Sequence, residues 1–345
     1  MPILSDEVDV VIGVDTHQRT HTAAIVLASG AHVATVTVDA TPAGYEELFL
    51  AASAHAGMRC WAIEGCGSWG HGLVGWLHAR GERVIEADRP KRPRRKMGRK
   101  SDNIDALRAA REALSAERVA IPRGQGQRDA VAAAQAAREM AISAAADSER
   151  QLLSLALTAP EELASLLRGL TTSKTVAICA EWQPEQFADP WARSIALTLN
   201  RVARRVSDLH DEAAEHEATL NMLITQWRPD VLAEQGVGPV VAAIVLSAWS
   251  HPGRIRSEAA FAMIAGCAPL EASSGETVRH RLNRGGDRQL NRAIHTIYLT
   301  RLRHDPATKA YIERRCSQGK TRREARRCVK RYIARQLYKL LESNP

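Results

Sequence analysis

Four acidic side chains stand where the chain could gather them around metal ions. Asp15 ends an apolar, β-branched run, and Glu64 ends a second such run just before glycine. Asp102 and Asp105 are three positions apart in a segment that we expect to be helical, so they share one helix face. Carboxylates brought together at one end of a sheet repel each other, and divalent metal ions relieve that repulsion. We expect them to hold two ions of Mg²⁺ (or Mn²⁺), which suit oxygen ligands and clamp the attacking and leaving oxygens of a phosphodiester.

Each of these acids also has an ordinary structural interpretation. An Asp at a strand end is often a turn former, and an Asp at position 102 favours the N-terminus of a helix through the helix dipole. The ordered set of four is more specific than any one of them.

A second candidate site lies in "APLEASSGETVRHRLNRGGDRQLNRAIH", residues 268–295. It begins as a loop in which Ser273 and Ser274 precede Gly275, and either serine could be a nucleophile or a turn residue. No Gly-x-Ser-x-Gly elbow or nearby His-Asp pair indicates a hydrolase triad. Arginines that would suit a phosphate beside the hydroxyl follow the serines: Arg279, Arg281, Arg284 and Arg288.

A basic loop, "RPKRPRRKMGRK" (89–100), leads directly into the Asp102–Asp105 segment. Its position predicts a nucleic-acid contact beside the metal site, and a solvated loop is the alternative. The residues that we expect to bind nucleic acid here are Arg92, Arg94, Arg95, Lys96, Arg99 and Lys100.

The elements around the acids predict an α/β fold. Three consecutive strand patterns, 8–18, 21–30 and 32–41, form an antiparallel meander. Helical patterns then alternate with strands at 59–67 and 83–90, which gives a mixed sheet. Asp15 and Glu64 would end the first and fourth strands, ahead of a helix that carries the other two acids.

Beyond this layer the sequence predicts helices. Residues 130–225 are rich in Ala, Leu, Glu and Arg, as in long paired helices, although the heptads are irregular. "EQGVGPVVAAIVLSAW" (234–249) fits a helix-hairpin-helix-like element or a plain glycine-rich helix start, and basic helices follow. We divide the chain into an α/β domain (1–122), a helical, coiled-coil-like oligomerisation segment (123–228) and a mainly α C-terminal domain (229–345).

Composition limits the class of protein. The chain has 47 Lys and Arg against 39 Asp and Glu, and this net charge of +8 favours a polyanionic partner. Its six cysteines show no Cys-x-x-Cys pair, which argues against a zinc site or a disulfide framework. No apolar run reaches the length of a membrane span, and the start does not read as a signal peptide. We expect a cytoplasmic, nucleoid-associated protein with no membrane partner.

The order of the acids resembles the RuvC branch of the RNase H-like nucleases. Together, "GVDTHQRTH", "AIEGCG", "GRKSDNIDA" and the serine segment 268–295 resemble the transposases of the insertion-sequence 110 family. The resemblance covers nearly the whole chain and is weakest over 125–225.

This resemblance implies a site-specific DNA recombinase with two catalytic parts. The RuvC-like domain of the family has an Asp-Glu-Asp-Asp set, which corresponds here to Asp15, Glu64, Asp102 and Asp105. The nucleophilic serine before a glycine corresponds to Ser274, with Ser273 as the alternative. Family members are similar in pairing donor and target DNA with a non-coding bridge RNA, and in acting as homo-oligomers (dimers or tetramers) with composite sites.

Two other functions fit parts of the sequence. A RuvC-like, metal-dependent DNA nuclease would use water as its nucleophile and would need the serine loop only for structure. A non-catalytic nucleic-acid-binding protein would use the acids only to cap its elements.

Overall fold

The computed structural model describes residues 3–87, 102–116, 119–122, 126–271, 280–283 and 285–343. For Asp102, Glu271 and residues 280–282 it describes the backbone but not the side chains. The chain divides into two compact units, residues 1–125 and 126–345. The expected boundary after residue 228 lies inside the second unit, and the three-part division of the sequence stays a prediction.

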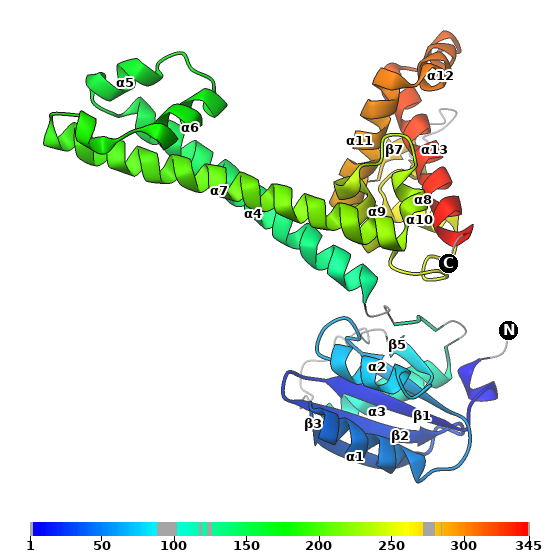
Figure 1. Ribbon diagram of the computed structural model, residues 1–345. Helices are drawn as coiled ribbons and strands as arrows, with labels where there is room; N and C mark the ends of the chain where they lie inside the picture. Colours follow the sequence, from blue (N-terminus) through cyan, green and yellow to red (C-terminus); the bar gives the residue numbers. More distant parts are fainter. Residues whose placement is uncertain are drawn as a thin grey trace. The chain divides into compact units, whose positions relative to one another are not determined.

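The first unit is built on a five-stranded sheet with the strand order β3-β2-β1-β4-β5 (Figure 1). β1 pairs antiparallel with β2 and β2 with β3, whereas β1, β4 and β5 run parallel. The predicted mixed α/β sheet is therefore confirmed. The strands are β1 (Val10–Thr16), β2 (Thr20–Leu27), β3 (His32–Asp39), β4 (Arg59–Glu64) and β5 (Val84–Ala87).

Helices cover both faces of this sheet. α1 (Pro42–Ser53) and α2 (His71–His78) pack on one face, where they meet alternate residues of β1 such as Ile12 and Val14. α3 (Asp102–Leu114) packs on the opposite face, with Val11 of β1 in its hydrophobic cluster. Because both faces are covered, β1 is buried along its whole length and reads as a nearly continuous apolar run.

Gly13 allows α3 to approach β1 very closely. A Cβ atom at Gly13 would lie 2.2 Å from the backbone oxygen of Ala106 and 2.4 Å from the backbone nitrogen of Ala110. The facing helix surface is made of alanines, and both Ala106 and Ala110 are fully buried. Backbone thus packs against backbone, and this contact fixes the height of α3 above the sheet.

The second unit begins with an arm of two long helices. α4 (Gln127–Leu157) and α7 (Pro190–Trp227) lie side by side along the arm (Figure 1), with small residues such as Ala145 and Ala213 buried. The predicted helical remainder is confirmed, but the connection between the two helices is itself helical. It contains α5 (Glu161–Leu167), α6 (Thr172–Glu181) and the 3₁₀ turn η2 (Pro184–Gln186), and these elements close a separate hydrophobic cluster at the end of the arm.

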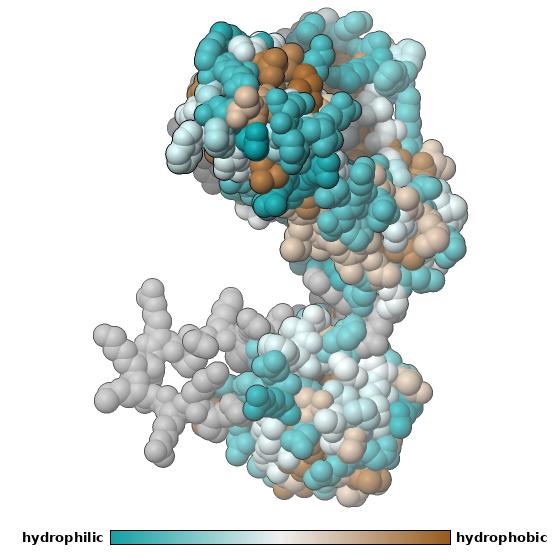
Figure 2. Space-filling model, turned by 60° about the vertical axis from the view of Figure 1, so that its left-hand side comes forward, coloured by the Kyte–Doolittle hydropathy of each residue, from teal (hydrophilic) through white to brown (hydrophobic). Residues whose placement is uncertain are grey.

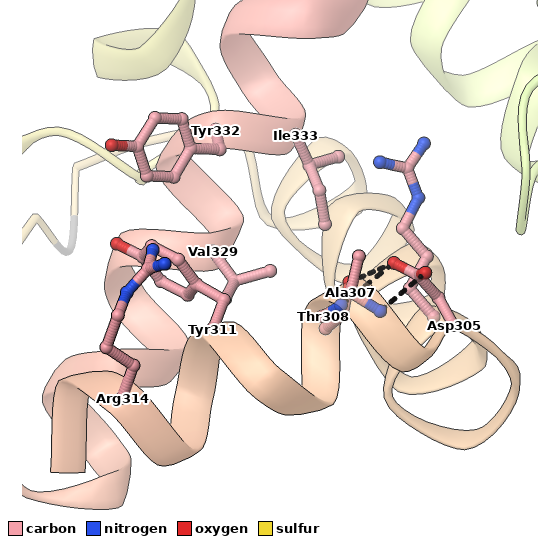
Figure 3. Close-up of a pocket in the computed structure, with 9 residues that line it drawn as sticks. Asp305, Ala307, Thr308, Tyr311, Arg314, Val329, Tyr332 and Ile333 are labelled. Carbon is pink, nitrogen blue, oxygen red and sulfur yellow. Dashed lines mark hydrogen bonds between the residues drawn. The ribbon is translucent and has the colours of Figure 1, made fainter. Parts of the chain in front are cut away.

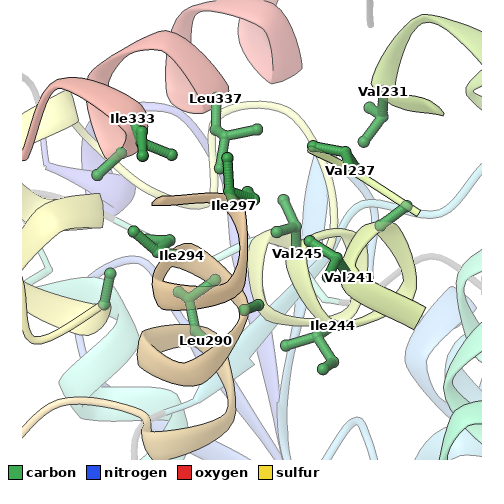
Figure 4. Close-up of a cluster of buried hydrophobic side chains, with 14 of the residues drawn as sticks. Val231, Val237, Val241, Ile244, Val245, Leu290, Ile294, Ile297, Ile333 and Leu337 are labelled. Atoms are coloured by element: carbon green, nitrogen blue, oxygen red, sulfur yellow. The ribbon is translucent and has the colours of Figure 1, made fainter. Parts of the chain in front are cut away.

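The C-terminal part of this unit packs around one large hydrophobic cluster, which also takes in residues of α4 and α7. Figure 4 shows Leu290, Ile294 and Ile297 of one helix filling the space between two others. The one-turn α8 precedes α9 where the sequence predicts a helix-hairpin-helix-like element. The elements are α8 (Pro229–Leu232), α9 (Pro239–Trp249), α10 (Glu258–Ile264), β6 (Pro269–Glu271), β7 (His280–Leu282), α11 (Arg288–His304), α12 (Pro306–Ser317) and α13 (Arg322–Ser343).

Among the described residues, no helix has the length and apolar character needed to cross a membrane.

The contact at Gly13 gives a prediction about stability. Replacing Gly13 with Ala forces α3 away from β1, and overpacking of this kind costs about 1–3 kcal/mol. Hydrogen exchange should show faster exchange in peptides from α3 and β1 of the Gly13→Ala variant. Gly67→Ala is the matched control, because its Cβ would meet no atom within 4 Å. Equal exchange protection of α3 in the two variants would contradict this account of the packing.

Candidate active site

Asp15 and Glu64 lie at the ends of neighbouring parallel strands and on the same face of the sheet. The register pairs Val14 of β1 with Ile63 of β4, so the two acids directly follow a paired position. Side chains alternate along a strand, and Gly13 faces α3, so Asp15 faces the α3 side as well. On β4 the same alternation applies, since Ala62 belongs to the cluster beneath α3 and Glu64 lies two positions further on.

Thr16 holds these two strand ends together. Its hydroxyl donates a hydrogen bond of 2.8 Å to the backbone oxygen of Glu64. The turn after β4 continues through Gly65, which has a positive φ of 70°, and Gly70 packs against the Thr16 methyl group. Asp15 is only 8% exposed at this edge. The hydroxyl of Thr16 thus fixes the spacing of the two strand ends that carry the acids.

The first turn of α3 lies toward the same end of β1. Arg111, near the end of α3, donates to the backbone oxygen of Gly30 in the turn that closes β2 and β3, at the opposite end of the sheet. α3 therefore runs antiparallel to β1 over the Gly13 contact, and its start lies toward Asp15. Asp105 is one turn before the buried Ala109, and Asp102 is one turn before Ala106, so both begin the face that packs on the sheet.

The side chain of Asp105 is described, whereas that of Asp102 lies outside the described atoms. Asp105 is 23% exposed and forms a 3.4 Å ion pair with Arg108, three positions further along the helix. Within the described part of the chain, no three His, Cys, Asp or Glu side chains lie close enough together to hold a metal ion. The structure thus brings the backbones of the four acids toward one edge, and the closure of a four-carboxylate cluster stays a prediction.

The donor atoms at this edge suit a hard cation. Asp15 and Glu64 carry carboxylates to this edge, and carboxylate oxygens are the ligands that Mg²⁺ and Mn²⁺ prefer. Burial raises the pKa of the Cys66 thiol, two residues after Glu64, to about 12. This thiol therefore stays protonated at neutral pH, and a protonated thiol is a poor metal ligand.

The serine segment forms the loop of a short antiparallel hairpin. In the pairing of β6 with β7, Pro269 lies opposite Leu282 and Glu271 lies opposite His280. Ser273 and Ser274 lie in this loop, outside the described residues, as does Arg279. The structure therefore defines how the base of the hairpin is held and leaves the choice between the two serines as a prediction.

Close packing and hydrogen bonds fix the base of this hairpin to the end of α10. A Cβ at Gly286 would lie 2.6 Å from the Cα of Gly266, so the two backbones touch. Asn283, which follows β7, donates through its side chain to the backbone oxygen of Met263 at 2.9 Å. The backbone nitrogen of Asp287 donates to the oxygen of Ile264 at 2.7 Å. The chain that follows β7 is thus anchored to the end of α10, a few residues before β6 begins.

Asn291 and Lys330 extend this anchor to α13. Asn291 donates through Nδ2 to the backbone oxygen of Ala265 at 2.7 Å, and Lys330 donates through Nζ to Oδ1 of Asn291 at 2.8 Å. Burial lowers the pKa of Lys330. Burial also lowers the pKa of His295, one turn after Asn291, and the charges of Lys330 and Arg326 add to this effect. Lys330 and Arg326 thus place positive charge near the base of the serine hairpin, and the lowered pKa of His295 favours its neutral form.

The predicted nucleic-acid-binding residues are described only in part. Arg288 is exposed at the start of α11, next to the helix cap formed by Asp287. Arg281 lies in β7, where only its backbone is described. The remaining predicted residues lie outside the described residues: Arg92, Arg94, Arg95, Lys96, Arg99, Lys100, Arg279 and Arg284.

Sequence patterns do not single out Thr16, Asn291 or Lys330. Each acts through a partner that is distant in sequence, and a hydroxyl or amide that binds a distant backbone oxygen leaves no local spacing signal. The sequence shows only that Thr16 directly follows a candidate acid, Asp15.

Comparison with known proteins matches both parts of the chain. A DEDD transposase model of the IS110 type matches residues 12–160, which contain all four acids. A model described as the transposase IS116/IS110/IS902 family matches residues 231–313, which contain both serines. The chain is also similar to a Streptomyces coelicolor protein described as "Insertion element IS110 uncharacterized 43.6 kDa protein".

The identity to this relative is 29% over 139 residues, or 39% of this chain and 34% of the relative. The chain therefore spans about a third of the length of that curated protein. The two matches lie along the chain in the expected order, with the acids in the first match and the serines in the second. These two domains and this relative thus relate both parts of the chain to the IS110 family of transposases.

Proposed function

We propose that this protein is a DNA transposase that cuts and rejoins strands at specific sites through a phosphoserine intermediate. The observation that carries the proposal is the occurrence of both family domains in one chain, with Asp15 and Glu64 on one face at adjacent strand ends. A RuvC-like nuclease that uses water is the alternative, and the serine segment inside the second family match favours the transposase.

In the proposed reaction the Ser274 hydroxyl attacks a DNA phosphorus atom. The bond from phosphorus to the serine oxygen forms as the bond from phosphorus to one deoxyribose oxygen breaks. The serine proton passes to a basic group, and the released DNA hydroxyl takes up a proton. A hydroxyl of another strand then attacks the same phosphorus and frees the serine, so strands rejoin without an external energy source.

The carboxylates would prepare this step. Asp15, Glu64, Asp102 and Asp105 would bind Mg²⁺ or Mn²⁺, which supplies Lewis-acid stabilisation of the charge that develops on phosphodiester oxygens. Asp15 is nearly buried, so a divalent cation beside it would offset part of the cost of desolvating its charge. The hydrogen bond of Thr16 to Glu64 would hold the two strand ends at a constant separation while the cation binds.

The proposed partners are donor DNA, target DNA and a non-coding bridge RNA that pairs with both. The positive net charge and the basic segments support binding of nucleic acid. In this proposal the protein is a dimer or tetramer, and Ser274 of one subunit reaches the carboxylates of another.

Exposed leucines at the end of the arm support this assembly. Leu157 is 85% exposed and Leu166 is 52% exposed, and Figure 2 shows hydrophobic patches among hydrophilic surface in this unit. Burying such side chains against a second copy would remove apolar surface from water.

The phosphoserine step predicts a covalent protein–DNA adduct that depends on one hydroxyl. Ser274→Ala should abolish the adduct, because no other atom replaces the nucleophilic oxygen, while nucleic-acid binding survives. The measurement is denaturing electrophoresis of the protein with labelled donor DNA, and Ser273→Ala is the matched control. An adduct that persists in Ser274→Ala and disappears in Ser273→Ala moves the nucleophile by one residue. Cleavage by the wild type without any adduct would instead support the water-dependent nuclease.

The proposed guide predicts that one RNA species accompanies the protein. Purified full-length protein, expressed with the DNA that flanks its gene, should retain a single structured RNA encoded beside that gene. Sequencing of the co-purified RNA tests this. The comparison is a variant of lower positive charge, in which the six basic residues named above in 89–100 are changed to Gln. Recovery of only heterogeneous cellular RNA would contradict the guided mechanism.

A further inference from the structure

A pocket of about 390 Å³ opens between α12 and α13. Its floor is apolar, made by Val329, Ile333 and Ala307, and polar or aromatic groups form its sides. Figure 3 shows Tyr332 of α13 facing Tyr311 and Arg314 of α12 at one end, with Asp305 at the other. Neither family motif nor any proposed catalytic residue uses this pocket.

The two tyrosines pack against each other, and one of them is largely exposed. Their rings meet edge to face, with centroids 5.6 Å apart and an interplanar angle of 85°. Tyr311 is half-buried, whereas Tyr332 is 53% exposed. Tyr311 therefore holds Tyr332 in place, and about half of the Tyr332 side chain stays accessible to a flat ligand. Exposed aromatic rings that are held in place in this way are the usual stacking platforms for unpaired bases.

Positive charge lies at the same end of the pocket. The guanidinium of Arg314 lies over the Tyr311 ring, 5.3 Å from its centroid, and that of Arg335 lies 5.7 Å from the centroid of Tyr332. Both arginines are exposed. The segment that contains the pocket, "YIERRCSQGKTRREARRCVKRYIARQ" (311–336), has far more basic than acidic residues, so its field attracts a polyanion.

The opposite end of the pocket is polar but less open to an anion. Arg301 is held by the backbone oxygen of Gln235 at 2.9 Å and by Glu234 at 3.2 Å, so it forms a fixed wall. Hydrogen bonds from Thr308 and from backbone amides lower the pKa of Asp305, so its carboxylate is charged at neutral pH. An anionic group would thus enter at the Arg314 end, whereas a donor such as an exocyclic amine suits Asp305.

We propose that this pocket binds an unpaired nucleotide of a single-stranded nucleic acid, with the base stacked on Tyr332 and the phosphate at Arg314. An unpaired base exposes the flat faces that stacking needs, whereas the bases of a duplex are already stacked on one another. The proposal rests on the proposed function in one respect, namely that this protein handles nucleic acid. It adds a site that distinguishes unpaired from paired strands.

Anisotropy titrations of the full chain test the stacking platform. The probes are labelled oligothymidylate and oligouridylate of about 20 nucleotides and a DNA duplex of the same length. Tyr332→Ala should weaken binding of both single strands roughly ten-fold and leave duplex binding unchanged. Tyr332→Phe, which keeps the ring, should bind like the wild type. Met222→Ala is the matched control, because Met222 is 52% exposed on α7, outside the pocket.

The outcomes separate this proposal from the proposed function. If the wild type binds single strands and Tyr332→Ala binds them equally well, the pocket proposal is overturned and the transposase proposal stands. If Tyr332→Phe loses as much affinity as Tyr332→Ala, base stacking is also ruled out. A wild type that binds no nucleic acid overturns both proposals. If the wild type binds one single-stranded probe more tightly than the other, and this difference in affinity disappears in Tyr332→Ala, the pocket is assigned to the more tightly bound kind, DNA or RNA.

The same titrations at several salt concentrations test the phosphate contact. Arg314→Gln should lower the salt slope for single strands by roughly one phosphate, about 0.7, whereas Tyr332→Ala should leave the slope unchanged. An unchanged slope in Arg314→Gln would overturn the placement of the phosphate at this end.

Discussion

The contact between Gly13 of β1 and the backbone of α3 determines where the acidic residues lie. The absence of a side chain at Gly13 lets the carbonyl of Ala106 approach within a distance that any Cβ would block. Since α3 is held this low over the sheet, its first turn stays near the ends of β1 and β4. A glycine and a row of alanines, with no chemistry of their own, therefore bring the segment that begins at Asp102 toward Asp15 and Glu64. Gly13 lies two residues before Asp15, so the packing contact and the candidate ligand share one strand face.

The second unit holds the base of the hairpin that leads to the serines in a comparable way. The serine loop is a short hairpin whose two ends are tied to the same helix end by the Gly266–Gly286 contact and by the side chain of Asn283. Lys330 then ties this base to α13 through Asn291. In both units a close backbone approach and a few hydrogen bonds from side chains hold the candidate groups, whereas the large apolar clusters supply general stability. The anchor of the hairpin and the proposed nucleotide pocket share α13, which contributes Lys330 to one and Tyr332 to the other.

The sequence allowed the succession of strands and helices up to β5 to be predicted, because strands and helices alternate with distinct periods and glycine or proline marks their ends. It also placed Asp15 and Glu64 at strand ends. It could not show that both acids face α3. Both faces of β1 are apolar, so the pattern does not reveal which face α3 covers. Nor did the composition of residues 130–225 show that the chain between α4 and α7 forms α5 and α6, which pack there around Trp182 and Phe187. The pair of Tyr311 and Tyr332 was not predicted either, because the two residues belong to different helices and meet only through tertiary packing.

The central claim is that the edge of the sheet next to the start of α3 holds a divalent metal ion. Electron paramagnetic resonance of Mn²⁺ added to the full chain measures this directly, without any need for DNA or turnover. The wild type should remove Mn²⁺ from the free signal at a site that weakens by at least about ten-fold in Asp15→Asn. Asp208→Asn, which changes an exposed carboxylate of the arm, should bind Mn²⁺ like the wild type. Equal Mn²⁺ binding by the wild type and by Asp15→Asn would contradict the claim.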